Sequence, residues 1–199
     1  MPIDFENKVA FIHVPKVAGT SIEVRYRLNN ARCLYSWDWK AYCVDGVQYA
    51  PQHLTPTLLR TIVPDFDAYT SFCFVRHPYA KMVSEYYFLH NAYYKKPIRI
   101  WSEWHFRRWL ERTASKKDMD HLLPQNAYAT GCQHVWRLEE LPEKIETLDR
   151  WFHFQGNEPL GHHKKANHTA KRTQGLKQKT KDLIYELYRE DFEALSFKR

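Results

Sequence analysis

Two apolar runs in this chain are each followed by a tight turn and then by a helix-like pattern. KVAFIHV (residues 8–14) leads into SIEVRYRLN, and YTSFCFVRHP (residues 69–78) leads into YAKMVSEYYFLHNAYY. Short apolar runs that alternate with helices are typical of a parallel sheet, because a parallel connection needs a crossover helix. We therefore predict one α/β domain over residues 1–199, with a central parallel sheet flanked by helices.

Further elements follow from the same reasoning. We predict helices within residues 55–64, 102–114, 141–151 and 181–195, and a short strand at FHF, residues 152–154. In the second of these helices Trp104, Trp109 and Leu110 are the expected core contacts. A long aromatic insert at residues 30–56 is expected to be a functional loop.

Composition limits the classes of partner and compartment. The formal net charge is +7, from 30 Lys and Arg against 23 Asp and Glu, which favours anionic partners, although a solvated basic face would give the same count. None of the four cysteines has CxxC spacing, which argues against a zinc site. We find no signal peptide and no membrane span, and so predict a cytoplasmic protein.

The segment PKVAGTS, residues 15–21, is here called the phosphate loop. It lies between the first predicted strand and its helix, where backbone N–H groups converge on an anion. Gly19 allows close approach of the backbone, Thr20 and Ser21 supply hydroxyl donors, and Lys16 supplies an ammonium group. The nucleoside triphosphatase pattern GxxxxGK(S/T) is not met, because the lysine precedes the glycine. An ordinary capped turn is the alternative interpretation.

A second group of polar residues follows the second strand. Arg76 stands at its carboxyl end, where α/β sheets bind ligands, and its planar fork suits a phosphate. Ser84 comes eight residues later, within the next helix, from which it could reach the same phosphate. A surface arginine and an unrelated helix serine are the alternative.

Together these segments resemble the sulfotransferases that use 3′-phosphoadenosine-5′-phosphosulfate, and IHVPKVAGTS and FVRHPY are most similar to the carbohydrate branch, which includes the heparan and chondroitin enzymes. HLLPQNAYA, RLEELPEKIETL, HHKKANHTAKR and YREDFEAL follow in the family's order. The resemblance implies a P-loop-like fold and a metal-free sulfuryl transfer. It also implies a nucleotide donor and a hydroxyl acceptor, expected to be a saccharide, and no nucleic-acid partner.

The resemblance also implies roles for single residues. The 5′-phosphosulfate would be held by the phosphate loop, with Lys16 at the bridging oxygen. The residues that would contact it are Pro15, Lys16, Ala18, Gly19, Thr20 and Ser21. Arg76 and Ser84 would hold the 3′-phosphate. A basic loop at residues 161–175 would close over the adenosine, with Lys171 and Arg172 as further phosphate contacts, although a solvated loop is the simpler alternative.

A hydroxyl acceptor needs a base, and histidine is the best residue for this at neutral pH. We predict His53, because related glycan enzymes use a histidine in a comparable stretch as base. His13, next to the phosphate loop, is expected to point into the core. His121, Gln125 and two tryptophans of the insert, Trp37 and Trp39, are the predicted acceptor contacts, although the tryptophans would equally suit a packed lid.

Two other function classes remain as alternatives. A nucleotide kinase-like phosphotransferase predicts GxxxxGK(S/T) and a metal-binding aspartate after a strand, and neither pattern is present in the sequence. A non-catalytic module that binds an anion, a glycan or a nucleotide predicts a basic surface without an organised donor site. Binding of adenosine 3′,5′-bisphosphate that depends on Arg76 would distinguish an enzyme from such a module.

Overall fold

The computed structural model describes residues 3–28, 42–156 and 172–199. The chain forms two compact units, of which the first comprises Met1–Arg76 and Asp118–His162 and the second His77–Lys117 and His163–Arg199. A single domain over residues 1–199 therefore stays a prediction.

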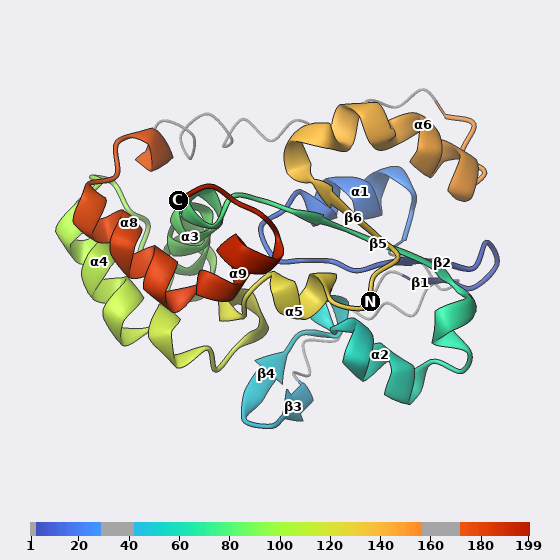
Figure 1. Cartoon of the computed structure of the whole chain (residues 1–199), viewed down its shortest axis with the longest axis horizontal. Coiled ribbons are helices and arrows are strands. Elements are labelled where there is room, and N and C mark those ends of the chain that lie inside the picture. The colour runs from blue at the N-terminus through green and yellow to red at the C-terminus, as the bar shows by residue number, and fades with distance from the viewer. Residues whose placement is uncertain (1–2, 29–41, 157–171) are drawn as a thin grey trace. The chain divides into compact units, whose positions relative to one another are not determined.

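The first unit contains a four-stranded sheet in the order β1-β2-β5-β6 (Figure 1). Its strands are β1 (Ile3–Asp4), β2 (Val9–Phe11), β5 (Thr70–Val75) and β6 (His134–Arg137). β2, β5 and β6 run parallel to one another, and β1 is antiparallel to β2. The two predicted strands are β2 and β5, and the predicted α/β fold is confirmed, with a sheet that is parallel except for β1.

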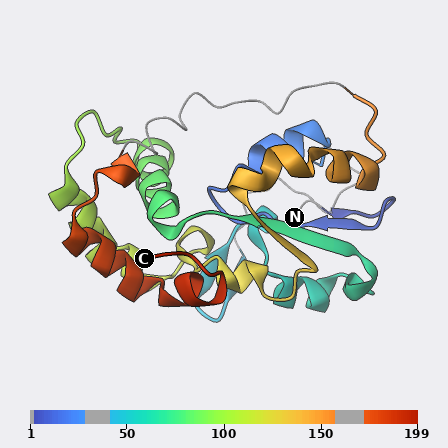
Figure 2. The ribbon, with the colours of Figure 1, turned by 45° about the horizontal axis from the view of Figure 1, so that its top comes forward.

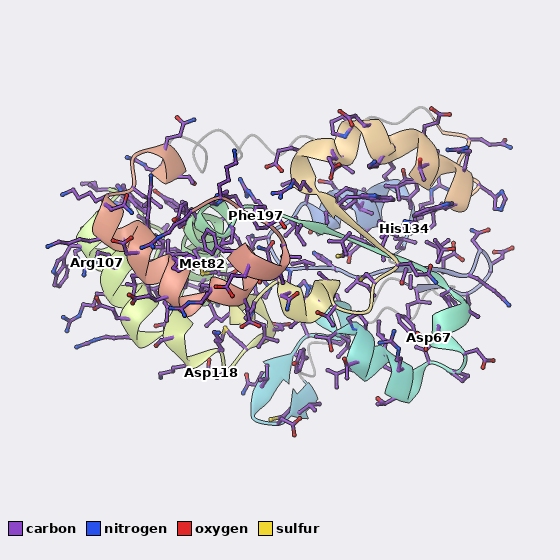
Figure 3. The ribbon with its side chains drawn as sticks, viewed as in Figure 1. Asp67, Met82, Arg107, Asp118, His134 and Phe197 are labelled. Atoms are coloured by element: carbon purple, nitrogen blue, oxygen red, sulfur yellow. The ribbon has the colours of Figure 1, made fainter. Side chains whose placement is uncertain are left out.

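Helices cover both faces of this sheet (Figure 1, Figure 2). α1 (Gly19–Arg25) and α6 (Leu141–Trp151) lie on one face, and α2 (Pro56–Ile62) and α5 (Asn126–Ala129) lie on the other. The ring of Phe72 on β5 packs 5.7 Å from that of Trp151, and His134 (Figure 3) packs 5.0 Å from the same tryptophan. Aromatic contacts of this kind fix α6 on the sheet.

Part of the aromatic insert is regular. β3 (Tyr42–Val44) and β4 (Val47–Tyr49) form an antiparallel hairpin, which is followed by a short 3-10 helix at Pro51–His53. The predicted irregular loop is therefore wrong for residues 42–49, and its first part lies outside the described residues. The other short 3-10 helices of this unit are Phe66–Ala68, Asp120–Leu122 and Leu138–Glu140.

The second unit is helical in its described residues. Its elements are α3 (Pro78–Phe88), a π-helical turn at Leu89–Tyr93, α4 (Glu103–Arg112), a 3-10 helix at Ala114–Lys116, α8 (Gln178–Leu187) and α9 (Arg189–Ala194). Met82 on α3 (Figure 3) and Phe106 on α4 are part of its core. Lys81 is buried there too, with its ammonium 5.5 Å from the centre of the Tyr188 ring.

Two predictions on local structure are wrong for stated reasons. FHF is a turn and not a strand, because it ends α6 in a Schellman motif. The N–H of Phe154 donates to the oxygen of Asp149 at 2.8 Å, and His153 takes a left-handed conformation with φ 47°. The predicted final helix is divided into α8 and α9, because Tyr188 leaves helical geometry with φ −126° and ψ 32°.

The predicted burial of α4 is correct for two of its three residues. Trp109 is 7% exposed and Leu110 is fully buried, but Trp104 is 62% exposed and so is not a core residue. At 3.6 residues per turn, positions 104 and 109 lie about 140° apart around the helix axis. Trp104 instead lies under the Arg108 guanidinium, 5.4 Å from the ring centre.

Candidate active site

The phosphate loop joins β2 to α1 and has an unusual backbone. Lys16 and Ala18 take left-handed conformations, with φ 67° and 59°. This geometry costs non-glycine residues on the order of 1–3 kcal/mol each, and such residues concentrate at functional sites. Alternation of left- and right-handed residues turns successive N–H groups toward one side and makes an anion-binding concavity. Two left-handed residues within three positions are compatible with such a concavity, and the binding of an anion by the loop stays a prediction.

Gly19 begins α1, and the structure gives a specific reason for glycine there. A Cβ atom at this position would lie 2.0 Å from Nε2 of His13. The His13 ring thus packs directly on the backbone at the start of the helix. His13 is 6% exposed, as predicted, and its Nδ1 lies 2.6 Å from Oε1 of the buried Glu23.

His53 is fixed beside the strand that leads into the phosphate loop. Its side chain is buried, and Nδ1 lies 2.8 Å from the backbone oxygen of His13. Because a carbonyl oxygen only accepts, Nδ1 must carry the proton and donate it. Nε2 then keeps its lone pair, and it lies 3.3 Å from Nε2 of Gln52. The ring is therefore held in the tautomer that can accept a proton at Nε2.

The surroundings of His53 also favour its neutral form. Burial, and after it the neighbouring His13 and His121, lowers the pKa of His53 well below its usual range. The ring centres of His13 and His121 lie 4.4 and 4.9 Å from that of His53. The three imidazoles come from three separate segments of the first unit, and His53 is neutral at neutral pH.

Arg76 follows β5 directly and lies at the same edge of the sheet as the phosphate loop. β2 and β5 are parallel neighbours with Phe11 opposite Phe72, so their carboxyl ends share one edge. Burial lowers the pKa of the half-buried Arg76, an effect that Glu139 opposes. The guanidinium stays protonated, because its usual pKa lies so far above neutrality.

The sequence profile described as the sulfotransferase family matches residues 2–198. The chain belongs to the sulfotransferase family. This sulfotransferase is accordingly a transferase enzyme that moves a sulfuryl group, and sulfuryl transfer as the predicted reaction is confirmed. The comparisons with curated proteins and with solved structures gave no match.

The other predicted site residues of the sulfotransferase lie in different places. His121 is half-buried against His53, and Gln125 is fully buried with its amide on the Arg76 backbone. Ser84 on α3 and Arg172 belong to the second unit, where the Arg172 guanidinium lies 5.8 Å from the centre of the Trp101 ring. Lys171, Trp37 and Trp39 lie outside the described residues. The roles of all these residues stay predictions.

Three polar residues near the site were not predicted from the sequence. Arg137 ends β6 opposite Val75, at the same edge of the sheet as Arg76. Recognition of HVWR as a third strand would have found it. Glu23 and Asp120 are buried carboxylates that hold the histidine segments. A buried carboxylate gives no local sequence signal, because its partner comes from elsewhere in the fold.

The described residues hold neither a cluster of metal ligands nor a helix able to span a membrane. Over residues 3–28, 42–156 and 172–199, no group of three or more His, Cys, Asp or Glu side chains could hold a metal ion. In the same part of the sulfotransferase, every helix is too short or too polar to cross a membrane.

Proposed function

We propose that this sulfotransferase moves a sulfuryl group from 3′-phosphoadenosine-5′-phosphosulfate to a hydroxyl group of a saccharide. The observation that carries the proposal is the position of the phosphate loop and Arg76 at one edge of the sheet. The N–H groups of the loop suit one phosphate of a nucleotide, and the Arg76 guanidinium at the same edge suits the other. Ser84, Lys171 and Arg172 are proposed as further contacts to the 3′-phosphate end.

The phosphate loop would hold the donor through the backbone N–H groups of residues 18–20 and the hydroxyl groups of Thr20 and Ser21. The predicted contact from the Ser21 N–H is left out, because that group donates to the Ala18 oxygen at 3.0 Å. Lys16 would stabilise the negative charge that develops on the leaving phosphate oxygen. Groups that are already oriented before charge develops give the largest electrostatic stabilisation, because they need no reorganisation during the reaction. The donor supplies an activated sulfuryl group.

His53 is proposed as the base. Its Nε2 takes the proton of the acceptor hydroxyl as the acceptor oxygen bonds to sulfur and the bond from sulfur to the bridging phosphate oxygen breaks. The electron pair of that bond stays on the phosphate, beside Lys16. In this proposal the Gln52 side chain, 3.3 Å from Nε2, moves aside for the acceptor. His121 would face the acceptor next to the base.

A saccharide acceptor is supported by the similarity of IHVPKVAGTS and FVRHPY to the carbohydrate branch. Aromatic side chains stack well on the apolar faces of sugar rings. Trp37 and Trp39 in the insert are the proposed stacking residues, and Gln125 and His121 come from the HLLPQ segment that follows in the family's order. The net charge of +7 would also favour an acidic saccharide over a neutral one.

Calorimetric titration with adenosine 3′,5′-bisphosphate tests the donor site. Arg76→Ala should weaken binding at least tenfold, because a charge-assisted hydrogen bond contributes about 1.5–3 kcal/mol. Arg60→Ala is the matched control, since Arg60 is an exposed arginine paired with Asp67 at 2.8 Å. Equal affinities of Arg76→Ala and the wild-type protein would refute the proposed donor site.

Transfer itself is tested with sulfur-labelled donor and a panel of saccharides, lipid-linked sugars and small alcohols. Label should move to at least one saccharide, and His53→Ala should abolish that movement while leaving bisphosphate affinity unchanged. Transfer only to the non-saccharide members of the panel would refute the acceptor class. Undiminished transfer by His53→Ala would refute the assignment of the base.

A further inference from the structure

Gln125 binds the backbone of Arg76 through both ends of its side-chain amide. The N–H of Arg76 donates to Oε1 of Gln125 at 2.8 Å, and Nε2 of Gln125 donates to the oxygen of Arg76 at 2.7 Å. Gln125 is fully buried. A buried amide with matched donors and acceptors holds its partner in one conformation, because any displacement leaves polar groups unsatisfied.

This pair of hydrogen bonds continues the sheet beyond its last strand pairing. The β5–β6 ladder ends at Val75 opposite Arg137, so Arg76 is the first residue without a strand partner in that ladder. Gln125 supplies a donor and an acceptor there, as a neighbouring strand would. Gln125 is itself fixed by α5, since its backbone oxygen accepts from the N–H groups of Tyr128 and Ala129, both at 2.9 Å.

Gln125 is one end of the segment Asp120–Gln125, and the other end holds the turn that carries His53. Oδ2 of the buried Asp120 accepts from the N–H of Ala50 at 2.7 Å, and Oδ1 accepts from the N–H of His121 at 2.6 Å. Ala50 caps the 3-10 helix of His53, because its oxygen accepts from the His53 N–H at 2.9 Å. The Tyr128 hydroxyl donates to the backbone oxygen of Asp120 at 2.8 Å and so joins α5 to this end of the segment.

We propose that the segment Asp120–Gln125 positions both functional groups of the site, with Gln125 as a positioning residue for Arg76 and Asp120 as one for His53. The inference rests on the proposed function, because it takes Arg76 as a phosphate contact and His53 as the base. It gives Gln125 a role through the Arg76 backbone in place of a contact with the acceptor.

The test at Gln125 measures affinity for adenosine 3′,5′-bisphosphate. Gln125→Met keeps the length of the side chain and removes both hydrogen bonds, so the dissociation constant should rise about tenfold. Gln133→Met is the matched control. Gln133 accepts from the N–H of Ser71 at 3.2 Å, at the other end of the same strand, and its loss should change the dissociation constant less than about twofold.

Gln125→Glu keeps the proposal testable if Gln125→Met folds poorly. An ionised carboxylate cannot donate to the Arg76 oxygen, whereas a protonated one can. Bisphosphate binding by Gln125→Glu should therefore be weak at alkaline pH and should approach that of the wild-type protein as the pH falls. A role in stability alone would restore binding only by refolding the protein, so the folded fraction is followed by circular dichroism at each pH. Absence of the recovery in a protein that is folded throughout would count against the inference.

The test at Asp120 uses the tautomer of His53, read from nitrogen-15 correlation spectra and assigned with His53→Gln. In Asp120→Asn the side chain has one acceptor oxygen in place of two, so it cannot hold the N–H groups of both Ala50 and His121. The turn that carries His53 is then held less firmly against the His13 oxygen. The Nδ1–H form of His53 should therefore lose population, while bisphosphate affinity stays within about twofold. An unchanged tautomer would overturn the assignment of Asp120.

The results also separate this inference from the proposed function. If the wild-type protein fails to bind bisphosphate, or if Arg76→Ala binds it equally well, the proposed function fails. If binding depends on Arg76 but folded Gln125→Met binds as tightly as wild type, only the positioning role of Gln125 is overturned.

Discussion

Gly19→Ala should destabilise this protein through one identified collision. The added Cβ would lie 2.0 Å from Nε2 of His13, about half of an ordinary carbon–nitrogen contact. The His13 ring cannot simply turn away, because Glu23 binds its Nδ1 at 2.6 Å inside the core. Overpacking of a core typically costs about 1–3 kcal/mol, and we expect the upper part of that range here.

A double-mutant cycle with His13→Ala isolates this collision. Once the ring is absent, Gly19→Ala should be neutral or stabilising by up to about 1 kcal/mol, since alanine favours helix over glycine. The coupling free energy between the two positions should then reach about 2 kcal/mol or more, measured by urea unfolding of the ligand-free protein. An equal cost of Gly19→Ala in both backgrounds would refute the packing argument.

Other predictions concern the base, the lysine and α4. Lys16→Ala should lower kcat about 10²-fold and leave bisphosphate affinity within a few fold, as single-turnover and titration experiments can show. Because the pKa of His53 is lowered from 6.5, kcat/KM should stay level down to that pH and fall only below it. Below pH 6.5 the unfolded chain binds a proton at His53 that the native state does not. As the pH falls below 6.5, the free energy of unfolding should therefore decrease by up to about 1.4 kcal/mol per pH unit. His53→Gln should lose that part of the slope in urea titrations. Trp104→Ala should change stability by less than about 0.5 kcal/mol, against about 3–5 for Trp109→Ala, and equal effects would contradict the burial of α4.

The sequence alone determined the strand–loop–helix units, and with them the positions of the phosphate loop after β2 and of Arg76 after β5. These features are local, because a buried apolar run, a turn residue and a helix cap act within a few positions of one another. Membership of the sulfotransferase family follows from the same linear pattern, since its profile matches residues 2–198.

Only the tertiary structure decided how the candidate base is held and what supports Arg76. The His13–Glu23 pair, the hydrogen bond from His53 to the His13 backbone, and the Gln125 amide on Arg76 join residues 10, 40 and 49 positions apart. No local pattern predicts such partners, because a buried polar side chain is satisfied by whichever backbone group the fold brings beside it. Gln125 is an example, because the sequence predicted only a contact with the acceptor, and the structure shows its amide on the backbone of Arg76, the residue after β5.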